Sequence, residues 1–198
     1  VSASMLLPEK NPWVGDEDGR AGDRMIPLGR ATAFSQADPP IRLLWITGHN
    51  PLSQDPDVKS MQEAIQAIET VVVADYYLTP SAKYADYVLP VATFLEQEDV
   101  VVSPWHYAVA LNEQALSPPG ECKSDFEIVR ELAGILNRLA PGFSRFPTER
   151  TAEEWLHIMM QSKLYERLGI SHYHELRGRY MKIDLPVVPW QDHIFPTP

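Results

Sequence analysis

Polar residues suited to ligand binding follow two apolar runs of the sequence. Gly48-His49-Asn50 comes after "IRLLWIT", and Asp75 ends "TVVVAD". Glycine lets the backbone approach a ligand closely, and a short amide offers both a donor and an acceptor. A carboxylate suits paired donors such as ribose hydroxyls or the N1–H and N2–H₂ edge of guanine. Asn and Asp at strand ends also make turns, so these residues alone leave a turn and a binding site open.

The elements that would position these residues form a parallel α/β sheet. The apolar runs at 41–47, 71–75 and 85–89 are short and continuous, which is typical of strands buried on both faces. In open α/β sheets, ligands bind outside the carboxyl ends of the strands. We therefore predict a Rossmann-like module, with helices on both faces and the polar strand ends at one edge.

Two helices are predicted to cover the sheet. Residues 56–69 carry an apolar stripe, and Asp55-Pro56 offers an N-cap followed by a proline at the first helical position. Residues 125–139 follow a capping box of Ser124 and Glu127, and their stripe is Val129, Leu132, Leu136 and Leu139.

Less regular pieces accompany these helices. The run "VVVSPWHYAVALNEQ" predicts one or two short strands with a break at Pro104. A second capping box, Thr151 with Glu154, opens another helix.

Composition narrows the class of protein. The chain has 198 residues and a net charge of -10, which argues against nucleic acid and anionic membranes as partners. No apolar run approaches the roughly 20 residues that span a bilayer, and no signal-peptide pattern opens the chain. The one cysteine, Cys122, excludes an internal disulfide and any multi-cysteine metal or iron–sulfur site in this sequence.

The domain organisation predicted from the sequence has three parts. Residues 1–40 are rich in Gly, Pro and Asp and predict an irregular arm or connection. Residues 41–140 form the α/β module, and residues 141–198 form a helical and extended tail. The start at Val1 and the proline-rich end suggest a piece of a longer polypeptide, with a further C-terminal domain.

Four motifs in this order resemble the third domain of the molybdopterin oxidoreductases related to dimethyl sulfoxide reductase and formate dehydrogenase. The family pattern is Gly-x-Asn-Pro, an acid at the next strand end, Thr-x-x-Ala-x-x-Ala-Asp-x-x-Leu-Pro with a Glu-rich turn, and Pro-Gly-Glu-x-x-x-Asp. Its counterparts here are Gly48–Pro51, Asp75, Thr79–Pro90 with Glu96–Glu98, and Pro119–Asp125. The tail "LPVVPWQDHIFPTP" resembles the run before the family's C-terminal domain.

This resemblance implies that the chain binds one guanosine arm of a bis-molybdopterin guanine dinucleotide carrying molybdenum or tungsten. The cofactor-binding residues it implies are Gly48, Asn50, Ala74, Asp75, Gln97 and Asp125. An anionic Asp repels a pyrophosphate, so Asp75 is expected to face base or ribose. Gln97 replaces the family's lysine, and an amide contacts the cofactor without charge assistance.

No catalytic or metal-ligating residue is expected in this chain. His172 and His174 are two apart, so on a helix they would face apart, and Cys122 is taken as an inert thiol. Asp86 is expected to make a structural hydrogen bond. The carboxylates at 96, 98 and 99 are interpreted as a solvated turn, because no histidine or acid partner is evident nearby.

The resemblance also implies a parent oxidoreductase whose metal ligand and iron–sulfur cysteines lie elsewhere, so this piece alone is expected to be inactive. Its expected partners are the other domains of that parent and an electron-transfer subunit, and its compartment stays open. Two alternatives remain. One is a non-catalytic relative, as in the large subunit of NADH dehydrogenase. The other is an unrelated nucleotide-binding module, such as the central domain of thiamine-dependent enzymes.

Overall fold

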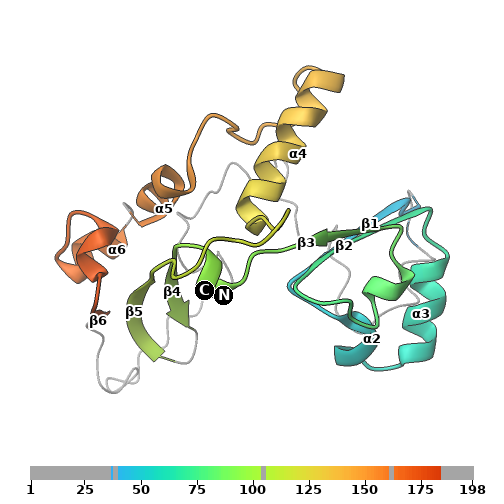
Figure 1. Cartoon of the computed structure of the whole chain (residues 1–198), viewed down its shortest axis with the longest axis horizontal. Coiled ribbons are helices and arrows are strands. Elements are labelled where there is room, and N and C mark those ends of the chain that lie inside the picture. Colours follow the sequence, from blue (N-terminus) through green and yellow to red (C-terminus); the bar gives the residue numbers. More distant parts are fainter. Residues whose placement is uncertain (1–36, 38–39, 104–105, 161–162, 184–198) are drawn as a thin grey trace, which may run out of the picture. The chain divides into compact units, whose positions relative to one another are not determined.

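The computed structural model describes residues 37, 40–103, 106–160 and 163–183. Nearly all of the predicted arms, 1–40 and 184–198, therefore lies outside the described residues. Contacts between Cα atoms divide the chain into two compact units (Figure 1). The parallel-sheet unit holds the described residues between 37 and 96 and from 116 to 148. The antiparallel-sheet unit holds those of 97–115 and 149–183.

The first unit is built on a three-stranded parallel sheet in the order β1-β2-β3. These strands are β1 (Leu43–Thr47), β2 (Thr70–Asp75) and β3 (Tyr87–Pro90). Successive strand residues point to opposite faces, and all four residues from Val71 to Ala74 are buried, so both faces of the central strand are covered. The predicted α/β class and its parallel sheet are confirmed.

The crossover between β1 and β2 contains two helices, α2 (Pro51–Gln54) and α3 (Val58–Gln66). Met61 and Ile65 of α3 are buried in one cluster with Ile46, Val71 and Val73 of the sheet, so α3 covers one sheet face. The apolar stripe predicted within 56–69 is therefore confirmed at Met61 and Ile65, whereas Val58, the first residue of α3, is exposed.

The predicted start of this crossover helix is wrong. Asp55 follows α2 as its C-cap, and the N-cap of α3 is Asp57, with a left-handed φ of 56°. The Asp57 side chain accepts a hydrogen bond from the Ser60 amide at 3.2 Å. The proline at the first helical position is Pro51, which opens a short helix that the spacing did not indicate.

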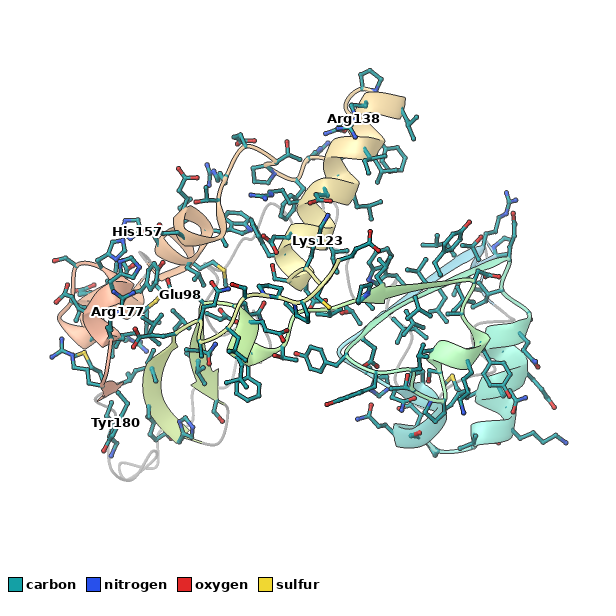
Figure 2. All side chains as sticks on the ribbon, in the orientation of Figure 1. Glu98, Lys123, Arg138, His157, Arg177 and Tyr180 are labelled. Carbon is teal, nitrogen blue, oxygen red and sulfur yellow. The ribbon has the colours of Figure 1, made fainter. Side chains whose placement is uncertain are left out.

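Helix α4 (Asp125–Leu139) begins with the predicted capping box, since Ser124 and Glu127 exchange both hydrogen bonds. Figure 2 labels Lys123 and Arg138 near the two ends of this helix. Lys123 pairs through its backbone with the end of β3. Its carbonyl accepts from the Ala92 amide at 2.8 Å, and its amide donates to Pro90 at 3.3 Å. The start of α4 is thereby held at the carboxyl edge of the sheet.

The predicted apolar stripe of α4 is not a buried face. Only Ala133 is buried, and Val129 and Leu139 are exposed. Two single-turn 3-10 helices, η3 (Ala82–Tyr84) and η4 (Phe94–Glu96), complete the described part of this unit.

The second unit has an antiparallel sheet in the order β4-β5-β6. Its strands are β4 (Asp99–Ser103), β5 (His106–Asn112) and β6 (Tyr180–Lys182). The prediction of one or two short strands around Pro104 is confirmed, and β4 and β5 are two strands. Its helices are α5 (Ala152–Met160), α6 (Lys163–Leu168) and the 3-10 helix η5 (Tyr173–Leu176). The predicted capping box of Thr151 and Glu154 is present before α5.

The core of this second unit joins its sheet to its helices. Val109 of β5 is buried together with residues from α5, α6 and η5: Met160, Leu164, Tyr165, Leu168, Tyr173 and Leu176. No helix in the described part of the chain is long and apolar enough to cross a bilayer.

Candidate functional site

A pocket of about 280 Å³ lies at the carboxyl edge of the parallel sheet. It is lined by the ends of β1 and β2, the start of α2 and the first residue of α4. This is the edge of an open α/β sheet at which ligands bind. Its lining residues are Thr47, Gly48, His49, Asn50, Gln54, Ala74, Asp75, Tyr76, Thr79, Val91 and Asp125. Five of the six residues predicted from the sequence are therefore brought together.

Asn50 has a structural contact as well as a place in the pocket. Its Oδ1 accepts hydrogen bonds from the Ser81 hydroxyl at 2.6 Å and from the Ser81 amide at 3.3 Å. Ser81 is fully buried, and its hydroxyl also accepts from the Leu52 amide at 3.1 Å. Because Oδ1 is occupied, the group that Asn50 can offer a ligand is the Nδ2 amide, a donor.

Asp75 likewise combines a turn with a pocket position. Its Oδ1 accepts from the amides of Tyr76 at 2.7 Å and Tyr77 at 3.3 Å, which closes the turn after β2. For Oδ2, no hydrogen bond occurs within the portion of the chain that the structure describes. The turn and the binding role, open alternatives in the sequence, are therefore compatible, because they use different oxygens.

Asp125 is held at the pocket by the end of β1. The Thr47 hydroxyl donates to Asp125 Oδ1 at 2.5 Å, across 78 residues of sequence. Asp125 is also the first residue of α4, where the partial positive charge of the helix start favours a carboxylate. Its second oxygen can accept from a ligand.

The backbone shapes the pocket at Gly48 and Ala74. Gly48 has φ 62°, and a Cβ built there would meet no atom within 4 Å. The conformation rather than crowding therefore favours glycine at this position. Ala74 is 3% exposed and contributes a small side chain.

The sixth predicted residue, Gln97, is not among the described residues that line the pocket. It belongs to the antiparallel-sheet unit, and its carbonyl accepts from Asn112 Nδ2 at 2.9 Å. Its cofactor contact stays a prediction.

The electrostatics of the pocket favour donors. Burial raises the pKa of Tyr76, and the negative charges of Asp125, Asp75 and Glu96 raise it further. Two carboxylates with spare acceptor atoms suit N–H and O–H groups and oppose a phosphate. The lining also contains residues that were not predicted from the sequence, among them Thr47, Gln54, Tyr76, Thr79 and Val91. Thr47 and Tyr76 directly flank predicted residues.

Three predictions concern residues outside the pocket. The one for Asp86 is confirmed, and those for Glu98 and for the pair His172 and His174 are wrong. Asp86 Oδ2 accepts from the Val71 amide at 2.8 Å, as expected of a structural group. Glu98 is not simply solvated: it accepts from the Tyr173 hydroxyl at 3.0 Å and lies 3.4 Å from His174 Nε2. The rings of His172 and His174, expected to face apart, have centroids 4.6 Å apart. His172 has extended backbone before η5, so helical spacing does not apply.

Comparison with known proteins identifies the family of the chain. Residues 20–135 match the family described as "Molybdopterin oxidoreductase". The chain belongs to the molybdopterin oxidoreductase family, whose members are molybdopterin-dependent oxidoreductases. The resemblance inferred from the four motifs is thereby confirmed.

Individual relatives cover different parts of the chain. It is 34% identical to "Probable oxidoreductase YyaE" of Bacillus subtilis over 83% of its own length and 24% of that protein. It is 40% identical to the F420-dependent formate dehydrogenase subunit alpha of Methanocaldococcus jannaschii over 47% of its length and 14% of that protein. The chain thus spans about a quarter or less of these relatives.

A solved structure supports the fold. Acetylene hydratase from Pelobacter acetylenicus superposes with a TM-score of 0.55 at 23% identity, over 79% of this chain and 20% of that one.

Proposed function

We propose that this chain is part of a molybdenum or tungsten oxidoreductase and holds one guanosine arm of a bis-molybdopterin guanine dinucleotide. The observation that carries the proposal is the pocket that assembles Gly48, Asn50, Ala74, Asp75 and Asp125 at one sheet edge. When bound, the cofactor's metal would supply the oxygen-atom or electron transfer of the parent enzyme.

The donor and acceptor set of the pocket fits a nucleoside. Asp75 Oδ2 and the second oxygen of Asp125 would accept from the N–H edge of guanine or from ribose hydroxyls. Asn50 Nδ2 would donate to an acceptor on the same nucleoside, and Gly48 would admit it close to the backbone. A volume of about 280 Å³ suits one nucleoside rather than a whole dinucleotide.

The remaining parts of the proposal concern the parent enzyme. We place the cofactor-binding module at 41–140 and include a contact from the Gln97 amide. The pyrophosphate would lie away from the two pocket carboxylates because like charges repel. The iron–sulfur cluster, the metal ligand and the electron-transfer subunit would be supplied by other parts of that enzyme, with the remaining domains as direct partners.

The test compares how much cofactor the full-length wild-type protein and its Asp75→Asn variant retain. This substitution replaces the carboxylate oxygen that would accept from the ligand with an amide NH₂ group. The NH₂ group is a donor and cannot pair with the N–H or O–H donors of the nucleoside. Losing a charge-assisted hydrogen bond costs about 1.5–3 kcal/mol of binding free energy. The affinity for the cofactor should therefore fall about tenfold to a hundredfold. Guanine nucleotide, pterin and metal released from the purified protein are quantified per chain.

Asp57→Asn is the matched control. It makes the same chemical exchange at an exposed N-cap, where asparagine serves equally and tolerates a left-handed φ. The control should retain wild-type cofactor content. Unchanged content in Asp75→Asn and in Asn50→Ala would mean that these strand ends only make turns. Absence of pterin and metal from the wild-type protein would instead favour the non-catalytic relative.

A further inference from the structure

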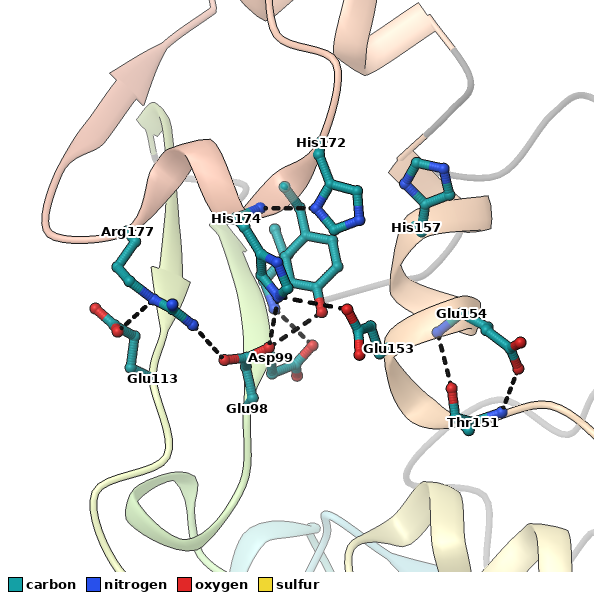
Figure 3. Close-up of polar contacts among 12 residues, drawn as sticks. Glu98, Asp99, Glu113, Thr151, Glu153, Glu154, His157, His172, His174 and Arg177 are labelled. Carbon is teal, nitrogen blue, oxygen red and sulfur yellow. Dashed lines mark hydrogen bonds and ion pairs between the residues drawn. The ribbon is translucent and has the colours of Figure 1, made fainter.

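A cluster of ionisable side chains in the antiparallel-sheet unit has no part in the proposed nucleotide site. Glu153 of α5 and His172 and His174 at η5 each bring one possible ligand atom within 4.8 Å of the others (Figure 3). His174 Nε2 lies 3.8 Å from Glu153 Oε1. We propose that these three residues form a zinc site that cross-links α5 to η5.

The ligand set has the chemistry that zinc prefers. Two imidazole nitrogens and one carboxylate oxygen form a common three-residue zinc set, with water at the fourth position. Tetrahedral bonds of about 2.0–2.2 Å place ligand atoms about 3.3 Å apart, so the cluster must contract slightly. The side chain of Glu153 is 62% exposed and can rotate inward without disturbing the core.

The two histidine rings are held in place by their surroundings. The His172 ring stacks on His157 at 4.7 Å and 21°, and on Tyr173 at 4.8 Å and 28°. Tyr173 is fully buried, and its amide donates to the Tyr165 hydroxyl at 3.0 Å. The Glu175 carboxylate accepts from the amides of Ser171 and His172, which fixes the backbone before η5. A metal would therefore meet rings that need little reorganisation.

Binding a metal at His172 would break one hydrogen bond of its ring. His172 Nδ1 accepts from the His174 amide at 3.3 Å, so the neutral ring carries its proton on Nε2. Zinc at Nδ1 would replace this long hydrogen bond, and zinc at Nε2 would move the ring proton to Nδ1. Either route loses one weak contact.

Charge around the cluster also favours a divalent cation. Glu98 Oε1 lies 3.4 Å from His174 Nε2, close to where the metal would sit. Glu98 keeps its own partners, because the Tyr173 hydroxyl donates to Oε1 and Arg177 lies 3.5 Å from Oε2. Arg177 also pairs with Glu113 at 2.8 Å, as the dashed lines in Figure 3 show. Glu98 therefore adds negative charge near the site without being needed as a ligand.

The experiment titrates the full-length protein with Zn²⁺ against a chromophoric chelator. Wild-type protein should bind one more zinc ion per chain than the double variant His172→Ala/His174→Ala. Glu153→Gln should weaken this site by more than about tenfold, because even the outer partners of metal ligands contribute that much. Mg²⁺ at the same concentration should not compete, since it prefers all-oxygen sites.

His106→Ala is the matched control, since His106 is an exposed histidine at the start of β5 in the same unit. It should leave zinc binding unchanged. Hydrogen exchange supplies a local readout: zinc should slow exchange in α5 and η5 of the wild type and leave Glu153→Gln unaffected. Glu153 is exposed, so this variant retains the fold and decides the question even if the histidine variants unfold. Equal zinc affinity in wild type and Glu153→Gln, or no saturable zinc binding, would overturn the proposal.

Discussion

The hydroxyl of Thr47 donates a 2.5 Å hydrogen bond to Oδ1 of Asp125, joining the end of β1 to the first residue of α4. This bond links elements 78 residues apart and fixes one carboxylate at the mouth of the pocket. Thr47 was not among the residues predicted to form the site. The bond therefore shows that Thr47 holds the Asp125 carboxylate in place.

Removing this hydroxyl should release Asp125. Thr47→Val keeps the side-chain shape but leaves Oδ1 without its donor, and a hydrogen bond to a charged group contributes about 1.5–3 kcal/mol. Because Thr47 is exposed at the strand end, we expect a loss near the lower end of that range, measured by denaturant unfolding. Thr47→Ser retains the donor and should stay close to wild type. A similar loss in both variants would show that packing, rather than the bond, matters.

Gly48 should tolerate asparagine better than alanine. Its φ of 62° is left-handed, which costs an ordinary L-residue roughly 1–2 kcal/mol, whereas Asn enters this region more readily. No atom lies within 4 Å of an added Cβ, so strain rather than a clash sets the cost. The free energy of unfolding of Gly48→Ala and Gly48→Asn checks this order. A reversed order would mean that the added side chain meets a different environment.

The buried contact between Ser81 and Asn50 should appear as a coupled pair. Ser81→Ala removes the donor to Asn50 Oδ1 and the acceptor of the Leu52 amide. Leaving a buried group unpaired costs about 1–3 kcal/mol in the free energy of unfolding. Ser81→Ala, Asn50→Ala and the double variant form a double-mutant cycle. Strictly additive effects would contradict the direct hydrogen bond.

Stability should depend on pH through His172. Burial, His174 and His157 lower its pKa, against the opposite effect of Glu153 and Glu175. Between this lowered pKa and the unfolded value of about 6.5, the unfolded chain binds more protons, so stability rises with pH. The free energy of unfolding should therefore fall as pH drops through that window.

His172→Gln should flatten this dependence, because glutamine does not titrate. Denaturant unfolding at several pH values between 5 and 8, in the presence of a metal chelator, measures the difference. An identical pH profile in wild type and His172→Gln would show that other groups cause it.

Local signals in the sequence determined the parallel sheet and most of the lining of the pocket at its carboxyl edge. Short apolar runs predicted β1, β2 and β3 within two residues, and the capping box of Ser124 and Glu127 predicted the start of α4. These features depend on neighbouring residues, so they can be read without the fold. The four motifs added Asp125, whose distance along the chain hides its proximity to the strand ends.

Contacts between distant segments could be decided only by the tertiary structure. Oδ1 of Asp75 closes the turn after β2, and Oδ1 of Asn50 accepts from Ser81, 31 residues away. Asp55 serves as the C-cap of a short helix that begins at Pro51, and α3 begins after Asp57 instead. His172 and His174 meet Glu153 because the chain is extended at His172 and packs against α5, which helical periodicity cannot represent. Side-chain chemistry is local, but which atoms remain free for a ligand depends on packing between segments.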